Sequence, residues 1–148
     1  IKFYKFLQGI GLAPRKSLAL GRIKLPHIYF KDFLRGVIDG DGNISMWTHK
    51  TNRNTQWSLR IFSASPVFVK WLKTQTESEF KVKGKLYKVT RDNNNPLYTI
   101  KFGKLAAKII LEGCYYTSCM ALNRKHDKAL KCINTLNGLS KYGSVISI

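Results

Sequence analysis

Two aspartates, Asp39 and Asp41, stand at the end of an apolar segment and are the side chains best suited to chemistry. Residues 30–38 carry apolar side chains at helical spacing, and Gly36 and Gly40 would let a second helix approach closely. A helix has a partial negative charge at its C-terminal end, so two carboxylates there need a nearby cation. Because the simplest such cation is a metal ion, the spacing predicts a buried helix that ends in a metal-binding acidic tip.

Two other kinds of structure place aspartate and glycine at similar spacing. A calcium-binding loop that starts at Asp39 needs glycine at its sixth position and glutamate at its twelfth, but the chain has Ile44 and Lys50 there. This mismatch excludes a calcium loop. A plain helix-to-strand turn, in which the two aspartates are only solvated, remains open.

The charge of the chain indicates a polyanionic partner. Its 148 residues include 26 lysines and arginines against 8 aspartates and glutamates, which gives a net charge of +18. This excess favours nucleic acid over an acidic membrane surface, and no apolar run long enough for a membrane span is present. A basic protein of ribosomal type would need no paired acids, so the acidic tip argues against that class. With 44% apolar residues, the chain can form one domain with its own core.

The cysteines and histidines predict neither a disulfide framework nor a zinc site. The three cysteines include no pair separated by two residues, and the three histidines are scattered along the chain. This usage fits an intracellular, reducing compartment. The chain begins with Ile1 rather than methionine, which suggests a trimmed start, and nothing there resembles a signal peptide.

The periodicity of apolar residues and the positions of turn residues predict the order of elements along the chain. Helices are expected in residues 1–12, 26–39, 65–76, 104–113 and 122–136, a strand or extended arm in 17–23, and strands in 43–50, 56–63, 81–91 and 97–102. In the helix from 104, Leu105, Ile109 and Ile110 are expected to face inward. Residues 1–138 then form a single domain, with an N-terminal extension in 1–25 and the acidic-tip helix in 26–42, followed by a tail in 139–148.

The ten residues 33–42 read Phe-Leu-Arg-Gly-Val-Ile-Asp-Gly-Asp-Gly and resemble the LAGLIDADG motif of homing endonucleases. The matching positions are Leu34, Gly36, Ile38, Asp39, Asp41 and Gly42. The likeness in the order of elements covers residues 13–136 and is specific only around the motif. It implies an α+β, homing-endonuclease-like αββαββα fold, with a four-stranded antiparallel saddle-shaped sheet, helices on one side and DNA on the concave face.

The chain carries one such motif, and in this family a single motif implies a homodimer. Two motif helices would then pack across a twofold axis, each against its symmetry mate. The residues expected in this interface are Leu34, Gly36, Val37 and Gly40. The two Asp41 carboxylates would converge, and divalent cations would be needed to keep both of them ionised.

The resemblance also implies roles for individual site residues. Asp41 matches the metal-binding aspartate, with the Gly40 carbonyl as a second ligand, and Mg²⁺ or another divalent cation such as Mn²⁺ is the expected cofactor. Asp39 matches the aspartate that caps backbone groups near the helix end. Lys104 matches the catalytic lysine close to the scissile phosphate, although a solvated lysine at a helix start is the alternative. Ser65 stands where the family often has a polar catalytic side chain, and capping the following helix is its alternative role.

Alternation of side chains along the four expected strands predicts a basic, partly aromatic face for DNA. The region 43–104 holds twelve lysines and arginines against three acids. In the major groove, lysine and arginine can donate to guanine, and hydroxyls can contact either base edge. The residues expected to contact DNA are Ser45, Trp47, His49, Ser58, Arg60, Lys83, Lys85, Tyr87, Thr99 and Lys101.

These features predict a site-specific double-strand DNA endonuclease, encoded in an intron, that cuts a long pseudo-palindromic target by metal-dependent hydrolysis. The alternative is a nucleic-acid-binding protein without cleavage, either an intron RNA maturase or a LAGLIDADG-type transcription regulator. Retention of both Asp39 and Asp41 favours the nuclease. Members of this family occur in organelles (mitochondrion or chloroplast) and in prokaryotic cytoplasm, so the expected intracellular location leaves the compartment open.

Overall fold

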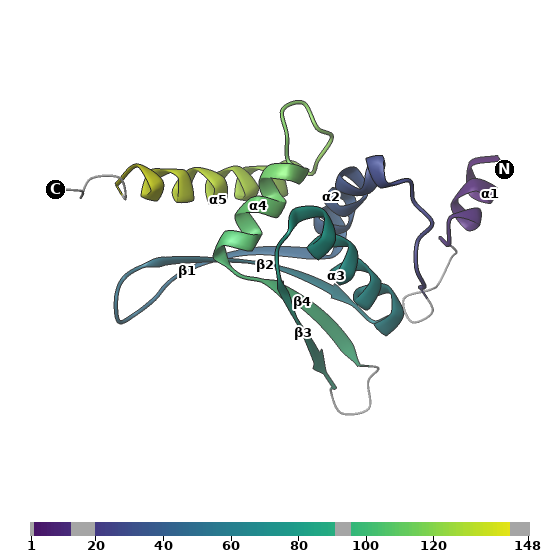
Figure 1. Cartoon of the computed structure of the whole chain (residues 1–148), viewed down its shortest axis with the longest axis horizontal. Helices are drawn as coiled ribbons and strands as arrows, with labels where there is room; N and C mark the ends of the chain where they lie inside the picture. Colours follow the sequence, from purple (N-terminus) through teal and green to yellow (C-terminus); the bar gives the residue numbers. More distant parts are fainter. Residues whose placement is uncertain (1, 13–19, 91–95, 143–148) are drawn as a thin grey trace.

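Four antiparallel strands form the sheet around which the chain is arranged (Figure 1). The structure is a computed structural model that describes residues 2–12, 20–90 and 96–142. Its helical elements are α1 (Lys2–Gly9), the 3₁₀ turn η1 (His27–Tyr29), α2 (Phe30–Asp41), α3 (Pro66–Phe80), α4 (Lys104–Cys114) and α5 (Asn123–Tyr142). Its strands are β1 (Gly42–Thr48), β2 (Thr55–Ser63), β3 (Gly84–Val89) and β4 (Leu97–Phe102).

The sheet has the strand order β1-β2-β4-β3, and each neighbouring pair is antiparallel. Ile44 pairs with Leu59, and Leu59 pairs with Phe102, so these three side chains lie in one row across the sheet. All three are buried in the core beneath the helices. Figure 1 shows α2 to α5 on one side of a curved sheet, and none of the described helices covers the other side. The expected α+β architecture is therefore confirmed.

The motif helix α2 passes directly into β1 at Gly42. Its inward side consists of Phe30, Leu34 and Ile38, which recur every four residues and are buried. A Cβ atom at Gly42 would lie 2.6 Å from the Ile38 carbonyl oxygen, so glycine is needed for this abrupt change of direction. Because β1 begins at the next residue and is an edge strand, Asp41 is held at the margin of the sheet.

Two helices run further than their sequence patterns predict. Ser65 caps α3 and Pro66 is its first residue, as expected, but the helix continues to Phe80, where Lys81 adopts a left-handed conformation with φ of 54°. The last helix, α5, extends to Tyr142, so the first part of the expected tail is helical. Residues 20–23 of the expected arm form no regular element. The rest of the arm (17–19), the turn at 91–95 and residues 143–148 lie outside the described residues.

The inward side of α4 differs from the prediction. Leu105 is 71% exposed and Ile109 is 44% exposed, so the inward placement of both was wrong, whereas that of Ile110 is confirmed. The buried residues of α4 are Ala107, Ile110, Leu111 and Cys114. This side packs against α2, α5 and β2, and small side chains at 107 and 114 let those elements approach closely.

All three cysteines are free thiols, as expected from their spacing. Burial raises the pKa of Cys114 to about 12 and that of Cys132 to about 11, so both thiols stay protonated at neutral pH. Among the described segments, no helix combines the length and the apolar composition that crossing a bilayer requires.

Candidate active site and nucleic-acid interface

Asp41, the last residue of α2, has an exposed side chain beside a hollow of about 380 Å³. The hollow is lined by Leu12, Leu20, Asp32, Phe33, Gly36, Val37, Asp41 and Phe68. The Gly40 and Asp41 carbonyls belong to the last helical turn, where backbone oxygens lack a partner further along the helix. These hard oxygen donors suit Mg²⁺. Within residues 2–12, 20–90 and 96–142, no three acidic, histidine or cysteine side chains come together.

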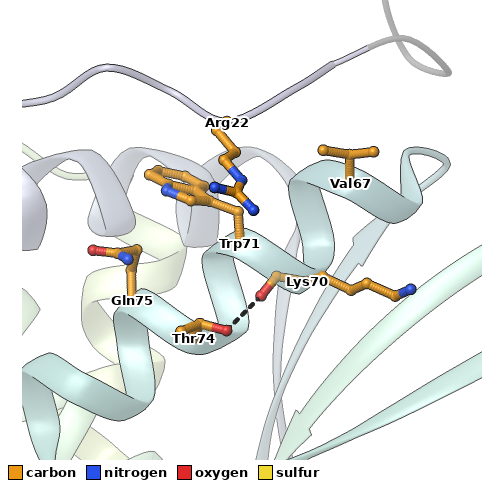
Figure 2. Close-up of a pocket in the computed structure, with 6 residues that line it drawn as sticks. All are labelled: Arg22, Val67, Lys70, Trp71, Thr74 and Gln75. Atoms are coloured by element: carbon orange, nitrogen blue, oxygen red, sulfur yellow. Dashed lines mark hydrogen bonds between the residues drawn. The ribbon is translucent and has the colours of Figure 1, made fainter.

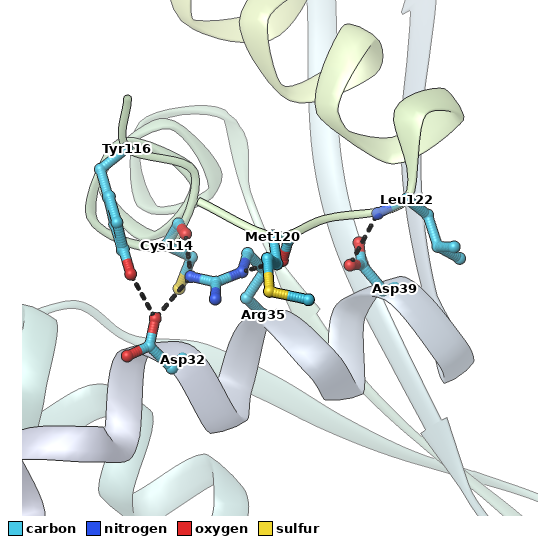
Figure 3. A network of polar contacts seen from close by, with 7 residues as sticks. All are labelled: Asp32, Arg35, Asp39, Cys114, Tyr116, Met120 and Leu122. Atoms are coloured by element: carbon cyan, nitrogen blue, oxygen red, sulfur yellow. Dashed lines mark hydrogen bonds and ion pairs between the residues drawn. The ribbon is translucent and has the colours of Figure 1, made fainter. Parts of the chain in front are cut away.

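Asp39, the first motif aspartate, lies inside the protein and binds the segment that leads into α5. Its carboxylate accepts a hydrogen bond from the Tyr115 hydroxyl at 2.7 Å and one from the Leu122 backbone N–H at 3.0 Å; the second is drawn in Figure 3. Burial, together with the hydrogen bond to Asp39, raises the pKa of Tyr115, so its hydroxyl remains a donor. The structural role expected of Asp39 is confirmed, but the backbone group that it caps belongs to Leu122, not to the end of its own helix. The alternative of two merely solvated aspartates is wrong for Asp39.

Lys125 on α5 supplies a cation at the C-terminal end of the motif helix. It is only 5% exposed, and its Nζ donates to the Ile38 carbonyl oxygen at 3.1 Å and also to the Gly42 carbonyl oxygen. Burial lowers the pKa of Lys125, an effect opposed by the nearby Asp39 and Asp41 carboxylates. The charge of the helix end therefore does not by itself require a metal ion, which corrects the argument made from the sequence.

Arg35, on α2, forms hydrogen bonds with the segment between α4 and α5 and so holds this segment against one side of α2 (Figure 3). Its Nε donates to the Met120 carbonyl oxygen at 2.8 Å, and its guanidinium also donates to the Cys114 carbonyl oxygen at 3.0 Å and to Asp32 at 2.6 Å. Tyr116 donates its hydroxyl to the same Asp32 carboxylate at 2.7 Å. The hydrogen bond from Tyr116 and the one from Arg35 lower the pKa of Asp32. This network covers one side of α2.

Another side of α2 remains open. Gly36 and Gly40 are exposed, and a Cβ atom added to either would meet no atom within 4 Å. Val37 is half-buried beside them. Leu34 is fully buried within the chain, so its expected place in an interface was wrong: its side of the helix packs against β2 and α4. A second helix can therefore reach Gly36, Val37 and Gly40, but not Leu34.

Ser65 does not have a hydroxyl available for catalysis. Its side chain is 1% exposed, donates to the Leu20 carbonyl oxygen and accepts from the Phe68 backbone N–H at 3.2 Å. The catalytic assignment of Ser65 was therefore wrong, and its alternative role as a helix cap is confirmed.

Lys104 lies at the wrong end of β4 for the acidic tip. Phe102, two residues before Lys104, is in the same row as Ile44, so β4 ends level with the interior of β1 and Lys104 follows beyond that point. Its placement next to the site was wrong because β4 runs parallel to β1 and carries Lys104 away from the start of β1. The lysine beside the tip is Lys125, which the sequence reasoning missed; the signal was a lysine four residues before Ala129, on the buried side of its helix.

The open side of the sheet carries the strand residues expected to contact DNA. The register places them on one side because Ser45 pairs with Ser58, Arg60 with Lys101, and Thr99 with Tyr87. The full set within the strands is Ser45, Trp47, Ser58, Arg60, Lys85, Tyr87, Thr99 and Lys101. His49 follows β1 and Lys83 precedes β3, and both are exposed. The shared side is confirmed, while contact with DNA stays a prediction.

Two residues of that set are less accessible than expected. Ser58 is fully buried and Thr99 is 9% exposed. Lys101 places its Nζ 5.7 Å from the centre of the Trp47 ring, and this contact bridges β2 because β4 and β1 flank it. The Ser58 hydroxyl and the Arg60 Nε find no hydrogen-bond partner in the described part of the chain. Because the Ser58 side chain is fully buried, its predicted contact with DNA is wrong for this conformation.

A second hollow, of about 380 Å³, lies along α3 and is not part of the acidic site (Figure 2). Arg22 and Lys70 lie around Trp71, whose ring packs edge-on against Phe30 and Phe33 at 6.4 and 5.9 Å. The Thr74 hydroxyl is engaged by the Lys70 carbonyl oxygen at 3.1 Å. None of its lining residues also lines the hollow beside Asp41, so the two hollows are separate.

Comparison with solved structures identifies the fold. The chain is similar to the LAGLIDADG meganuclease I-AabMI bound to uncleaved DNA, with a TM-score of 0.51 and 19% identity over 76% of this chain and 37% of that one. It is also similar to the group I intron-encoded homing endonuclease I-CeuI in complex with DNA, with a TM-score of 0.54 and 13% identity over 95% of this chain and 65% of that one. No protein-family model and no curated protein sequence matches. The chain therefore has the LAGLIDADG homing-endonuclease fold and spans less than two thirds of each of these proteins.

Proposed function

We propose that the chain is a LAGLIDADG homing endonuclease that binds duplex DNA on the open side of its sheet and cuts both strands as a homodimer. The observation that carries this proposal is the position of Asp41. Its exposed carboxylate ends a helix with an open glycine side, at the margin of a basic sheet. The two similar solved structures are DNA complexes of homing endonucleases, which supports the same partner for this chain.

Pairing would complete the acidic site. Two copies of α2 that meet through Gly36, Val37 and Gly40 would bring two Asp41 carboxylates together, each with a Gly40 carbonyl nearby. These oxygen atoms would hold Mg²⁺ or Mn²⁺, which when bound supplies a Lewis acid and an activated water for phosphodiester hydrolysis. Lys125 fixes the start of β1 through the Gly42 carbonyl oxygen and thereby holds the tip in place.

The proposed substrate is a long, near-palindromic duplex, because a twofold dimer presents the same sheet surface to each half of its target. Lys85, Lys101 and Arg60 would neutralise phosphates or donate to guanine on that surface. Affinity should fall by roughly 10³ to 10⁵ between 50 and 200 mM salt if each copy neutralises several phosphates. An intron-encoded gene in an organelle or a prokaryote remains the proposed origin.

A second candidate function is nucleic-acid binding without cleavage, as an intron RNA maturase or a transcription regulator. One observation favours it: Ser65 is committed to capping α3, and Lys104 lies far from Asp41. Of the side chains expected to assist hydrolysis, Ser65 is therefore buried with its hydroxyl engaged, and Lys104 lies away from the tip. Binding to the sheet would be unaffected by either placement.

Cleavage of the intronless form of the protein's own locus tests the proposal. The full chain should cut this duplex in Mg²⁺ and leave it intact in EDTA. Asp41→Asn should abolish cutting and keep binding, because it removes one ligand charge and none of the sheet's cations. Asp127→Asn, at an exposed position on α5, is the matched control and should cut normally. Equal cutting by Asp41→Asn would end the catalytic assignment, and binding without any cutting would favour the second candidate.

A further inference from the structure

The open side of the sheet ends in an apolar hollow that the basic residues do not explain. It has a volume of about 440 Å³. Four of its lining residues are apolar or aromatic, and the other three are a threonine and two cations: Phe62, Tyr87, Val89 and Leu97, with Thr99, Arg60 and Lys101. Val89 is 48% exposed and Tyr87 is 45% exposed, so this surface is in contact with water.

The strand register shows how the surface changes from basic to apolar. Arg60, Lys101 and Lys85 form one row across β2, β4 and β3. Two residues further along the strands, the same side carries a row of Phe62, Thr99 and Tyr87. The next row consists of Leu97 and Val89. One edge of the apolar surface is therefore bordered by cationic side chains. A purely apolar surface that contacts another protein would have no such border.

The hollow lies at the same end of the sheet as the acidic tip. Gly42 pairs with Ile61, so Asp41 is level with Phe62, the first apolar row. The turn between β1 and β2, at residues 49–54, lies at the opposite end of those strands. A ligand bound in the hollow would therefore lie nearer to Asp41, measured along the strands, than a ligand bound at the turn between β1 and β2.

We propose that this hollow binds the 5-methyl groups of thymines in the major groove and so selects A·T pairs in the part of each half-site nearer the cut. The thymine methyl is the apolar group that base edges present in the major groove, and the flanking Arg60 and Lys101 match the phosphates beside it. The inference rests on the proposed function, because it needs duplex DNA on this side of the sheet. Uracil lacks this methyl group, so the same contact favours DNA over RNA.

Replacing thymine by uracil tests the contact without altering base pairing. Duplexes that bind the full chain would be selected in EDTA from a randomised DNA library and resynthesised with uracil at every thymine. Burying one methyl group changes affinity about fourfold, so one contact should weaken binding about fourfold and two contacts more than tenfold. The selected duplexes should also be enriched in A·T pairs at defined positions in each half.

A matched pair of variants assigns the effect to the hollow. Val89→Ser should bind the thymine and uracil duplexes equally, because it removes an apolar wall. Val67→Ser, on α3 and 53% exposed, should keep the preference for thymine (Figure 2). Both valines are about half exposed, so neither change should prevent folding, and the uracil substitution on the unaltered chain needs no variant at all.

Three outcomes would overturn the inference. Equal affinity of the unaltered chain for the two duplexes removes the thymine contact but leaves the proposed function standing. Failure to bind any duplex removes the proposed function and the inference with it. A change in self-association caused by Val89→Ser in the absence of DNA would assign the hollow to a second copy of the chain.

Discussion

The Tyr115 hydroxyl lies 2.7 Å from the Asp39 carboxylate, and this buried hydrogen bond separates the roles of the two motif aspartates. Residues two apart on an α-helix point about 200° apart around its axis. When Asp39 turns inward to bind Tyr115 and Leu122, Asp41 must therefore turn outward, where its carboxylate is exposed. The two-residue spacing thus makes Asp39 a buried structural group and leaves the Asp41 carboxylate accessible as an oxygen ligand.

Removal of the Tyr115 hydroxyl should destabilise the protein. Tyr115→Phe leaves the buried Asp39 carboxylate with one hydrogen bond fewer, which should lower the free energy of unfolding by about 1–3 kcal/mol. Tyr116→Phe is the matched control: Tyr116 is 47% exposed and its partner Asp32 is also partly exposed, so the loss should stay under about 1 kcal/mol. Urea unfolding of both variants measures the difference, and equal losses would contradict the role given to Tyr115.

Loss of the Lys125 ammonium should have a larger effect than loss of a surface lysine. Lys125→Met leaves the Ile38 and Gly42 carbonyl oxygens without their donor and removes the cation beside Asp39, at a cost of about 2–4 kcal/mol. Lys128→Met, at an exposed position of the same helix, should change stability by less than about 0.5 kcal/mol. Urea midpoints of the two variants give the comparison; a Lys125→Met protein as stable as its parent would refute the assigned contact.

Asp32 should contribute stability only above acidic pH. Hydrogen bonds from Tyr116 and Arg35 lower its pKa from the ordinary value of 3.8. A carboxylate with a lowered folded-state pKa stabilises the fold above its unfolded pKa, and this contribution disappears as the pH falls through the folded value. Asp32→Asn should therefore be less stable than the parent at pH 7, by under about 1 kcal/mol because the side chain is 44% exposed, with the gap closing below about pH 4.

Urea midpoints at neutral and acidic pH would reveal this closing gap. Asp127→Asn serves as the control, since Asp127 is exposed on α5. A gap between parent and Asp32→Asn that widened as the pH fell would show that Asp32 is not stabilised as a carboxylate.

Local periodicity was sufficient to predict the elements and the shared side of the strands. The alternation of side chains along each strand was enough to predict that Ser45 and Arg60 face away from Ile44 and Leu59, because a strand has only two sides. The motif spacing likewise predicted that α2 would end in the acidic tip. These features depend on neighbours in the sequence, which is why a single chain reveals them.

Contacts between distant elements were not predictable in this way. Lys125 lies 83 residues after Gly42; its position four residues before Ala129 indicates the buried side of α5, but not that its ammonium reaches the end of α2. Leu34 and Gly36 both belong to the motif and were both expected in the dimer interface. Packing of α2 against β2 and α4 buries Leu34 within the chain, and the motif alone does not reveal this. Lys104 was misplaced for a similar reason, because its distance from Asp41 follows from strand order and direction, not from the sequence around it.

Enlarging Gly36 should abolish self-association without harming the folded chain. A Cβ at Gly36 would meet no atom within 4 Å, and leucine is a better helix former than glycine by about 1 kcal/mol, so Gly36→Leu should fold at least as stably as the parent. Across a twofold axis the same side chain would hold two α2 helices apart. Gly9→Leu, also in open space but on α1, is the matched control and should leave association unchanged. Sedimentation of each protein, alone and with its target duplex, decides the question: a monomeric parent on DNA, or an undisturbed dimer of Gly36→Leu, would contradict pairing through this side of α2.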